Sequence, residues 1–235
     1  KIVYAGANSA LPQPAADAVI QDLNGSFVMP GMTETHAHLS FADASPFAIG
    51  ETMVEDATIT AVKNSRLMLA SGFTSAVSFG STYQIDIALR DAINTGKVIG
   101  PRLLAAGRDL GATSSNVDSP GGLSQIADGP WALRKAVREQ RKIGVDVLKV
   151  FIDGENINQQ NPAGELSFTD EELHAVVDEA HRRQLKVACH SRSAAAVKQA
   201  VNAGVDFIGH ANYLDDEAVE LLAARKESVF VGPAL

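Results

Sequence analysis

The sequence predicts an α/β fold: a (β/α)8 TIM-type barrel, incomplete in this chain, preceded by part of a small β-sandwich. From Phe27 onward, short apolar runs alternate with stretches of helical length, which is typical of strand–helix units around a parallel sheet. The runs at 145–152 and 186–191 are nearly continuous in apolar residues, as expected for strands covered on both faces. No Gly-x-Gly-x-x-Gly motif follows a strand, which weakens the alternative of a doubly wound nucleotide-binding sheet.

The predicted elements divide the chain near residue 30. Residues 1–30 are short apolar runs broken by Gly, Pro and Asn, which favours β-hairpins and hence a partial sandwich. Residues 31–235 would form the barrel. Strands are expected near 27–36, 74–80, 102–107, 145–152, 186–191, 205–210 and 229–235. Helices are expected near 60–71, 84–95, 131–143, 170–183, 193–203 and 215–225.

The helix near 170–183 has the clearest local signals. Thr169 and Glu172 have the spacing of a capping box at its start. An apolar stripe at i, i+3, i+4 and i+7 follows: Leu173, Val176, Val177 and Ala180. Three glycines lie just past predicted helices, where a left-handed residue is favoured: Gly96, Gly144 and Gly204.

Three long loops, 39–59, 110–130 and 153–168, each follow a predicted strand and so lie at the carboxyl end of the sheet. In a barrel this face holds the active site. Removing 30 sandwich residues from 235 leaves 205, fewer than the ~250 of a typical barrel. We therefore expect the chain to stop before strand eight, as the front part of a longer protein.

The composition excludes several classes of protein. The chain has 20 Lys and Arg against 28 Asp and Glu, a net charge of −8, which argues against a nucleic-acid or anionic-membrane surface. No apolar run could span a membrane, and the one Cys excludes an internal disulfide. A cytoplasmic location is the default expectation, although a leader could be missing. An acidic barrel of this kind could also form a homo-oligomer through its outer helices.

His36 and His38, in the run MTETHAHLS, end the first barrel strand. Residues two apart on a strand face the same side, so the two imidazoles should point to one place. A lone buried histidine is usually a hydrogen-bonded core residue, whereas a pair at a strand end favours a metal site.

Lys149 lies inside the apolar run VDVLKVFI. Burying an unpaired ammonium costs several kcal/mol, so two alternatives are open. The lysine could extend to solvent or pair with a carboxylate such as Asp146. Alternatively, desolvation lowers its pKa and the amine reacts with carbon dioxide. The carbamate so formed has two oxygens suited to bridging two cations.

His190 and His210 end the strands KVACHS and VDFIGH. With His36, His38 and Lys149, they place four imidazoles and one lysine at one rim. Imidazole nitrogens suit Zn²⁺, and carboxylate-type oxygens suit a second divalent ion. Three other candidate donors lie on an outer helix or on the opposite face of a strand and are not expected to bind metal: His174, His181 and Cys189.

Five stretches together resemble the metal-dependent amidohydrolase superfamily. They are FVMPGMTETHAHLS, GPRLLAAGRDL, GVDVLKVFIDG, FTDEELHAVVDEAHRRQLKVACHS and AGVDFIGHANYLDDEAVELLA. The resemblance covers essentially the whole chain and is to the branch of Xaa-Pro dipeptidase-like and imidazolonepropionase-like hydrolases. It implies two divalent ions in a (β/α)8 barrel beside a small β-sandwich.

The resemblance also implies residue roles. His36 and His38 would bind the more buried metal, and Lys149, carboxylated by carbon dioxide, would bridge the two ions, most simply zinc. His190 and His210 would bind the second metal. Lys149 and His210 are accordingly the predicted catalytic residues. The family's eighth-strand Asp, which binds metal and shuttles the proton, has no candidate in this chain, so activity is expected to require a C-terminal part that is missing here.

The implied reaction is hydrolysis of an amide, peptide-like or carbamate C–N bond of a small molecule by a metal-bridging hydroxide. Ser193 stands where deaminases of the superfamily have a Glu, which favours hydrolysis over deamination. Arg192 could bind a substrate carboxylate, and Tyr213 could donate to the scissile carbonyl. Two alternatives stay open: a lactonase- or phosphotriesterase-like ester hydrolase, and a truncated, non-catalytic metal-binding chain.

Overall fold

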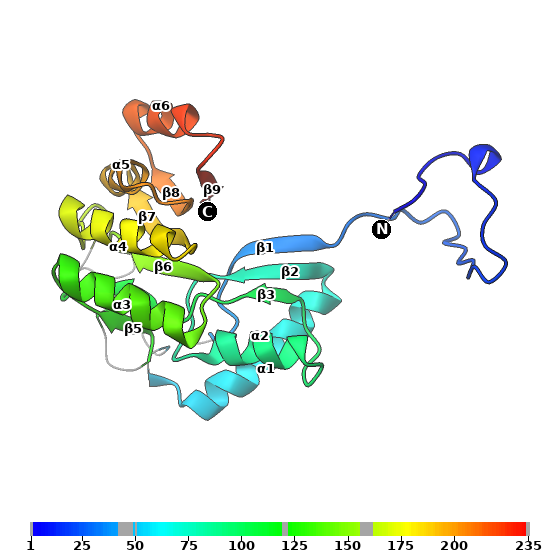
Figure 1. Ribbon diagram of the computed structural model, residues 1–235, viewed down its shortest axis with the longest axis horizontal. Helices are drawn as coiled ribbons and strands as arrows, with labels where there is room; N and C mark the ends of the chain where they lie inside the picture. The colour runs from blue at the N-terminus through cyan, green and yellow to red at the C-terminus, as the bar shows by residue number, and fades with distance from the viewer. Residues whose placement is uncertain (1, 42–48, 50, 119–121, 156–161, 234–235) are drawn as a thin grey trace. The chain divides into compact units, whose positions relative to one another are not determined.

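The computed structural model describes residues 2–41, 49, 51–118, 122–155 and 162–233. The chain forms two compact units, Lys1–Pro30 and Gly31–Leu235. Figure 1 shows the elements of the second unit, in which strands and helices alternate along the chain.

The helices of the second unit match the six predicted segments within a few residues, except that the first begins earlier. They are α1 (Val54–Ala70), α2 (Ile85–Asn94), α3 (Pro130–Ile143), α4 (Asp170–Arg182), α5 (Ala194–Ala203) and α6 (Asp216–Ala224). Thr169 and Glu172 make the predicted capping box, and Gly96, Gly144 and Gly204 all have positive φ. Within the described segments, no helix combines the length and apolar character needed to cross a bilayer.

The strands form two parallel sheets, which a backbone hydrogen bond joins between β3 (Arg102–Leu104) and β6 (Val147–Phe151). They are β1 (Met32–Ala37), β2 (Phe73–Ser78), β3 (Arg102–Leu104), β4 (Asp109–Gly111), β5 (Ser124–Ile126), β6 (Val147–Phe151), β7 (Lys186–Ser193), β8 (Phe207–Tyr213) and β9 (Phe230–Pro233). One sheet has the order β1-β2-β3 and the other β5-β4-β6-β7-β8-β9, with every pair parallel. The backbone amide of Asp146, just before β6, donates to the Ala105 carbonyl just after β3 at 2.8 Å, joining the two sheets.

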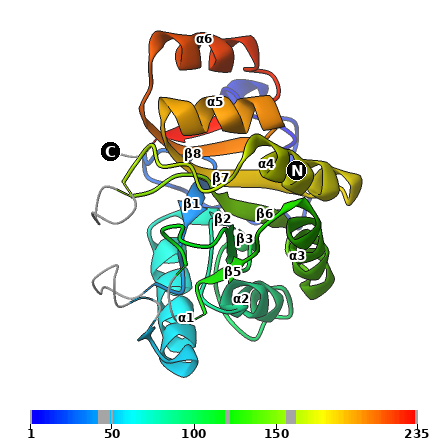
Figure 2. The ribbon, with the colours of Figure 1, turned by 90° about the vertical axis from the view of Figure 1, so that its left-hand side faces the viewer.

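This arrangement supports the α/β part of the fold prediction. Each predicted barrel strand is present, although residues 234–235 of the last one lie outside the described part. The strands follow barrel order, and Figure 2 shows the helices around the outside of them. Among the described residues the first and last strands, β1 and β9, are not paired, so a closed barrel is not observed.

Two details differ from the prediction within the second unit. The first strand begins at Met32 rather than Phe27, and the predicted loop 110–130 contains the short strands β4 and β5. α1 likewise begins inside the predicted loop 39–59, parts of which lie outside the described residues, as do parts of the loop 153–168.

The hairpins expected in residues 1–30 are not observed. Residues 2–30 contain one short 3₁₀ helix, Asn8–Ala10, and no strand. Val3, Val19 and Phe27 are more than nine-tenths exposed. An isolated two-stranded hairpin is only marginally stable in water, so apolar runs without a packed partner sheet do not hold strand pairing by themselves. The β-sandwich stays a prediction.

Successive side chains of each strand point to opposite faces of the sheet, one toward the outer helices and the other toward the interior enclosed by the strands. On β6, Leu148 and Val150 pack in the large cluster with the outer helices. Val147 belongs to a small inner cluster that also contains Phe79 and Ala188. Because side chains alternate along a strand, Lys149 faces the same interior as Val147. The same alternation on β7 turns Cys189 outward and His190 inward.

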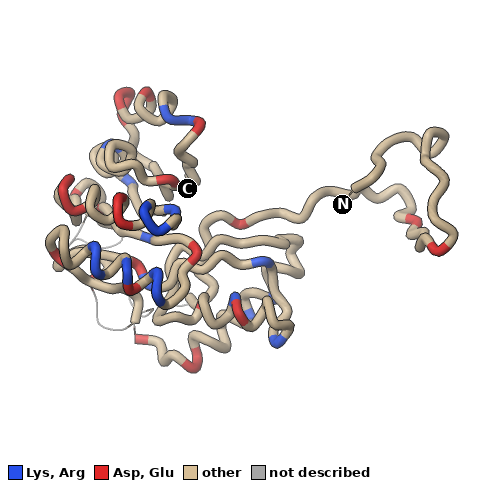
Figure 3. Tube along the Cα trace, viewed as in Figure 1, with Lys and Arg blue, Asp and Glu red and all other residues tan. Residues whose placement is uncertain are grey.

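Ion pairs join α3 and α4, whose basic and acidic positions are coloured in Figure 3. Arg134 pairs with Asp178 at 2.5 Å, and Arg138 pairs with Glu179 at 2.8 Å. Glu179 is buried beneath these contacts and also pairs with Arg183. Arg134, Arg138 and Arg183 are therefore engaged with carboxylates between and beside these helices.

Candidate metal centre

Four histidines meet at the carboxyl end of the strands: His36, His38, His190 and His210. The ring centroids of His36 and His38 are 5.2 Å apart, and those of His36 and His210 are 4.7 Å apart. Those of His190 and His210 are 4.4 Å apart. The structure thus brings together the four histidines that the sequence singled out, which we call the histidine cluster.

Irregular strand ends orient two members of the histidine cluster. The register of β1 against β2 shifts between Glu34 and Ala37, around His36. In β8, His210 and Ala211 have φ of 77° and 49°, and the register against β7 shifts just beyond His210. A left-handed conformation costs about 1–2 kcal/mol for each L-residue, and such strain often accompanies functional sites.

Lys149 lies below the histidine cluster, 1% exposed. Its Nζ donates to the Phe79 carbonyl at 3.0 Å and lies 4.8 Å from the centre of the Phe79 ring, which stacks on His36. Asp146, the carboxylate proposed as its partner, instead accepts from Arg90 at 2.6 Å. That pairing is wrong because Asp146 precedes β6 on the outer side, whereas Lys149 faces the interior.

Burial favours the neutral amine of Lys149. Desolvation lowers its pKa, and the negative charge of Asp109 opposes the shift. Asp109 is itself buried, and burial raises the pKa of its carboxyl to about 6. A desolvated neutral amine is the form that can react with carbon dioxide.

The histidine cluster is neutral at pH 7. Burial lowers the pKa of His36 to about 2 and of His38 to about 3, with the charge of Lys149 adding to both shifts. Burial and then the charge of Arg192 lower the pKa of His210 to about 3. For His190, burial followed by the charge of Lys149 lowers the pKa well below its ordinary value.

Two nitrogens of the histidine cluster have no hydrogen-bond partner within the described part of the chain. They are Nε2 of His190 and Nδ1 of His210, both buried. A buried polar atom without a partner is unfavourable unless something else binds it. A neutral imidazole with an unpartnered nitrogen is the usual form of a zinc ligand. The donor set therefore fits divalent metal ions.

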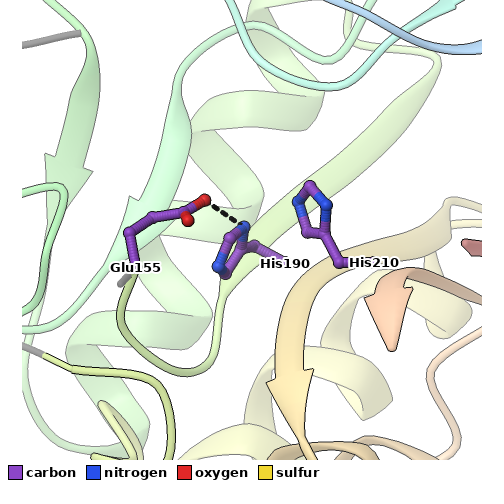
Figure 4. Close-up of side chains that lie close together, drawn as sticks. All are labelled: Glu155, His190 and His210. Atoms are coloured by element: carbon purple, nitrogen blue, oxygen red, sulfur yellow. Dashed lines mark ion pairs between the residues drawn. The ribbon is translucent and has the colours of Figure 1, made fainter. Parts of the chain in front are cut away.

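Glu155 is a member of the site that the sequence did not reveal. It follows Asp153 and Gly154 in the loop after β6, and its Oε1 lies 3.4 Å from Nδ1 of His190. Ligand atoms of Glu155, His190 and His210 all lie within 4.8 Å of one another (Figure 4). An acidic residue in a long loop gives no periodic signal, so only the path of the loop identifies it.

Comparison with known proteins shows the family of this chain. The profile of the Amidohydrolase family matches residues 27–227. The chain belongs to the amidohydrolase family. The family predicted from the sequence is therefore confirmed.

Three known proteins that are similar to this chain are hydrolases by name. Ochratoxinase from Aspergillus niger is 27% identical over 94% of this chain and 51% of its own. A prolidase complexed with N-methylphosphonate-L-proline is 28% identical, with a TM-score of 0.85 over 95% of this chain and 57% of its own. An Xaa-Pro dipeptidase with bound methionine is 30% identical, with a TM-score of 0.77 over 87% of this chain and 53% of its own. The chain thus spans about half the length of these relatives.

Arg192 lies at the rim of the site, where most of its donors contact neighbouring side chains. Its Nε and Nη2 donate to the two carboxylate oxygens of Glu155 at 2.6 and 2.9 Å. Its Nη1 donates to Oδ1 of Asn212 at 2.6 Å. These contacts use three of the five N–H donors of a guanidinium. Tyr213, the other predicted substrate contact, ends β8 with about half of its surface exposed.

The residues not expected to bind metal lie away from the histidine cluster. His174 is exposed on α4, where its Nδ1 contacts the Asp170 carbonyl. His181 contacts Asp206 at 2.8 Å. Burial raises the pKa of the Cys189 thiol to about 12, so it stays protonated. Ser193, where deaminases have a Glu, caps α5 by accepting from the Ala196 amide.

Proposed function

We propose that this amidohydrolase is a metal-dependent hydrolase that cleaves an amide, peptide-like or carbamate C–N bond of a small molecule. One observation supports this most directly. Four histidines and a buried lysine, from the ends of four strands, lie close together at the carboxyl end of the parallel strands. In barrel enzymes this face holds the catalytic residues.

Two divalent ions, most simply Zn²⁺, would be held by the five residues. His36 and His38 would bind one, and His190 and His210 the other. Nζ of Lys149 would attack the carbon of carbon dioxide, form an N–C bond and release a proton, leaving a carbamate to bridge the ions. When bound, the ions would supply a Lewis acid for the scissile carbonyl and lower the pKa of an attacking water.

The chain's own residues would bind and orient the substrate. Within the described part of the chain, the contacts with Glu155 and Asn212 leave two N–H donors of Arg192, enough to bind a substrate carboxylate. Tyr213, three residues after His210, would donate its hydroxyl hydrogen to the carbonyl oxygen. Phe79 and Phe151, packed against His36 and His190, would keep water from the inner side of the site.

The names of the relatives favour a C–N bond as the target. They include an Xaa-Pro dipeptidase, a prolidase complexed with N-methylphosphonate-L-proline, and ochratoxinase. A substrate with an amide to an amino acid and a free carboxylate would suit both the proposed ions and Arg192.

The test is a substrate panel on the zinc-loaded chain. Xaa-Pro dipeptides and N-acyl amino acids are compared with lactones, carboxylic esters and phosphotriesters, while bound metal is counted. Amide turnover that disappears on chelation supports the proposal. Ester turnover without amide turnover, or bound metal without any turnover, would contradict it. Replacing the exposed His174 by Gln is the control and should leave the rate unchanged.

A further inference from the structure

A pocket lies between the starts of α1 and α2, which pack side by side (Figure 2). Its volume is about 380 Å³, within the range of pockets that bind small molecules. Three apolar side chains form part of its wall: Val54, Ile85 and Ala88. Among the described residues, no member of the histidine cluster lines it. The pocket is therefore separate from the candidate metal centre.

Arg108 is the one charged side chain among the described residues that line this pocket. In the described part of the chain it forms no ion pair, and its Nη1 donates to the Ser124 carbonyl at a long 3.5 Å. Its Nε is buried without a hydrogen-bond partner. Arg90 and Arg134, on the outer helices, each pair with a carboxylate instead. A buried donor without a partner is unfavourable unless something else accepts from it.

Contacts with the backbone hold Arg108 in place. The buried Asp86 carboxylate accepts from the amides of Ala106 and Gly107, the two preceding residues, at 2.8 and 2.9 Å. Gln140 donates to the Arg108 carbonyl at 3.3 Å. The guanidinium therefore projects from a fixed segment, and a ligand that binds it does not have to order this part of the chain.

The lining of the pocket indicates the chemistry of its ligand. A guanidinium binds a carboxylate through two parallel N–H bonds, and the apolar wall would bury an apolar group beside it. A phosphate dianion or a polyanion is disfavoured, because the pocket has one cation and the chain has a net charge of −8. We propose that the pocket binds a small carboxylate with an apolar body, and that Arg108 binds its anionic group.

The experiment follows the backbone amide resonances of the full chain by NMR while benzoate is added. Benzoate should shift the resonances of residues 54–58 and 84–88 to saturation. Benzamide has the same shape without the charge, and acetate has the charge without the ring. Each should bind about 10-fold or more weakly than benzoate, because benzamide loses a charge-assisted hydrogen bond and acetate loses apolar burial.

Arg108→Gln should weaken benzoate binding about 10-fold or more, because the cation is lost. Ala88→Leu fills the pocket from an exposed helix position and should weaken binding similarly, which keeps the proposal testable if Arg108→Gln does not fold. Arg102→Gln is the matched control, because it removes the same charge from an exposed position on β3. It should bind benzoate as the parent does.

Three results would overturn the inference: equal binding of benzoate and benzamide, unshifted resonances at 54–58 and 84–88, and parental affinity in Arg108→Gln. Benzoate that shifts only the resonances of the histidine cluster would also overturn it, since a bound metal ion is then its partner. The inference does not rest on the proposed function, because it concerns a different site. A chain that binds benzoate as expected but hydrolyses no amide contradicts only the proposed function.

Discussion

Gly80, just after β2, contacts one member of the histidine cluster. Its carbonyl contacts Nδ1 of His38 at 3.0 Å, and its φ is +124°. A Cβ at this position would lie 2.2 Å from Oδ1 of Asp109, which is itself buried. The residue must therefore be glycine, both for its backbone conformation and for the space that Asp109 occupies.

We predict that Gly80→Ala lowers the free energy of unfolding by about 2 kcal/mol or more, because it combines backbone strain with a clash. Gly96→Ala is the control: φ is +75°, but no atom lies within 4 Å of the added Cβ, so about 1 kcal/mol is expected. Urea denaturation measures both. Equal losses in the two variants would show that Asp109 is not packed against Gly80.

Polar or ionisable residues within or at the end of apolar strands could be identified from the sequence alone. Lys149 in an apolar strand and histidines at strand ends are visible without a structure. Glu155 is not, because its importance arises from the loop that folds it against His190. The sequence also could not show how many hydrogen-bond donors of Arg192 are left for a substrate. In the folded chain, three of them already donate to Glu155 and Asn212.

The start of α4 shows how one side chain stabilises two helices. Glu172 accepts from the amide of Thr169 at 2.9 Å within the capping box. Its second oxygen accepts from the amide of Gly129, the N-cap of α3, at 2.8 Å. The two helices, which pack along their length through ion pairs, therefore share a carboxylate at their starts.

We predict that Thr169→Ala lowers the free energy of unfolding by about 1 kcal/mol, as loss of an N-cap usually does. Glu172→Ala should lower it further, because two backbone amides lose an acceptor. Glu171→Ala removes the same charge from the same turn, at an exposed position, and should have the smallest effect. Chemical denaturation curves test this order, and a Glu172 variant as stable as the Glu171 variant would contradict it.

Helices were predicted correctly where the apolar periodicity extends over several turns and a glycine marks the C-terminal end. α3 and α5, each followed by a left-handed glycine, lie within one residue of their predicted bounds. The strands β4 and β5 were missed because three residues give no measurable alternation. The hairpins expected in residues 1–30 are not observed among residues 2–30, since an apolar run forms a strand only where another strand pairs with it.

Acid should destabilise the metal-free molecule. The pKa of His36 falls from 6.5 to about 2 on folding, and those of His38 and His210 fall to about 3. Below pH 6.5 the unfolded chain binds protons that the folded chain does not, so stability falls with pH by about 1.4 kcal/mol per unit for each group. Asp109 opposes this below pH 6, because its pKa is raised on folding.

Asp109 is one group and the histidines with lowered pKa are several, so the free energy of unfolding should decrease as the pH falls. We predict that the urea midpoint in the presence of a chelator decreases steadily from pH 6.5 to pH 5. Reversible denaturation at half-unit steps measures it. A midpoint that is constant or rises over this interval would mean that the histidine cluster is protonated in the folded chain.

In the whole molecule, strands from both sheets bring together the five residues that we propose hold two divalent ions, with Lys149 between them. The most direct test counts ions bound per chain after reconstitution with Zn²⁺ and bicarbonate, for the parent and for Lys149→Ala. We predict two ions in the parent and at most one in the variant, with partial recovery on adding a short carboxylate. Two tightly bound ions in both proteins, or none in the parent, would contradict the account.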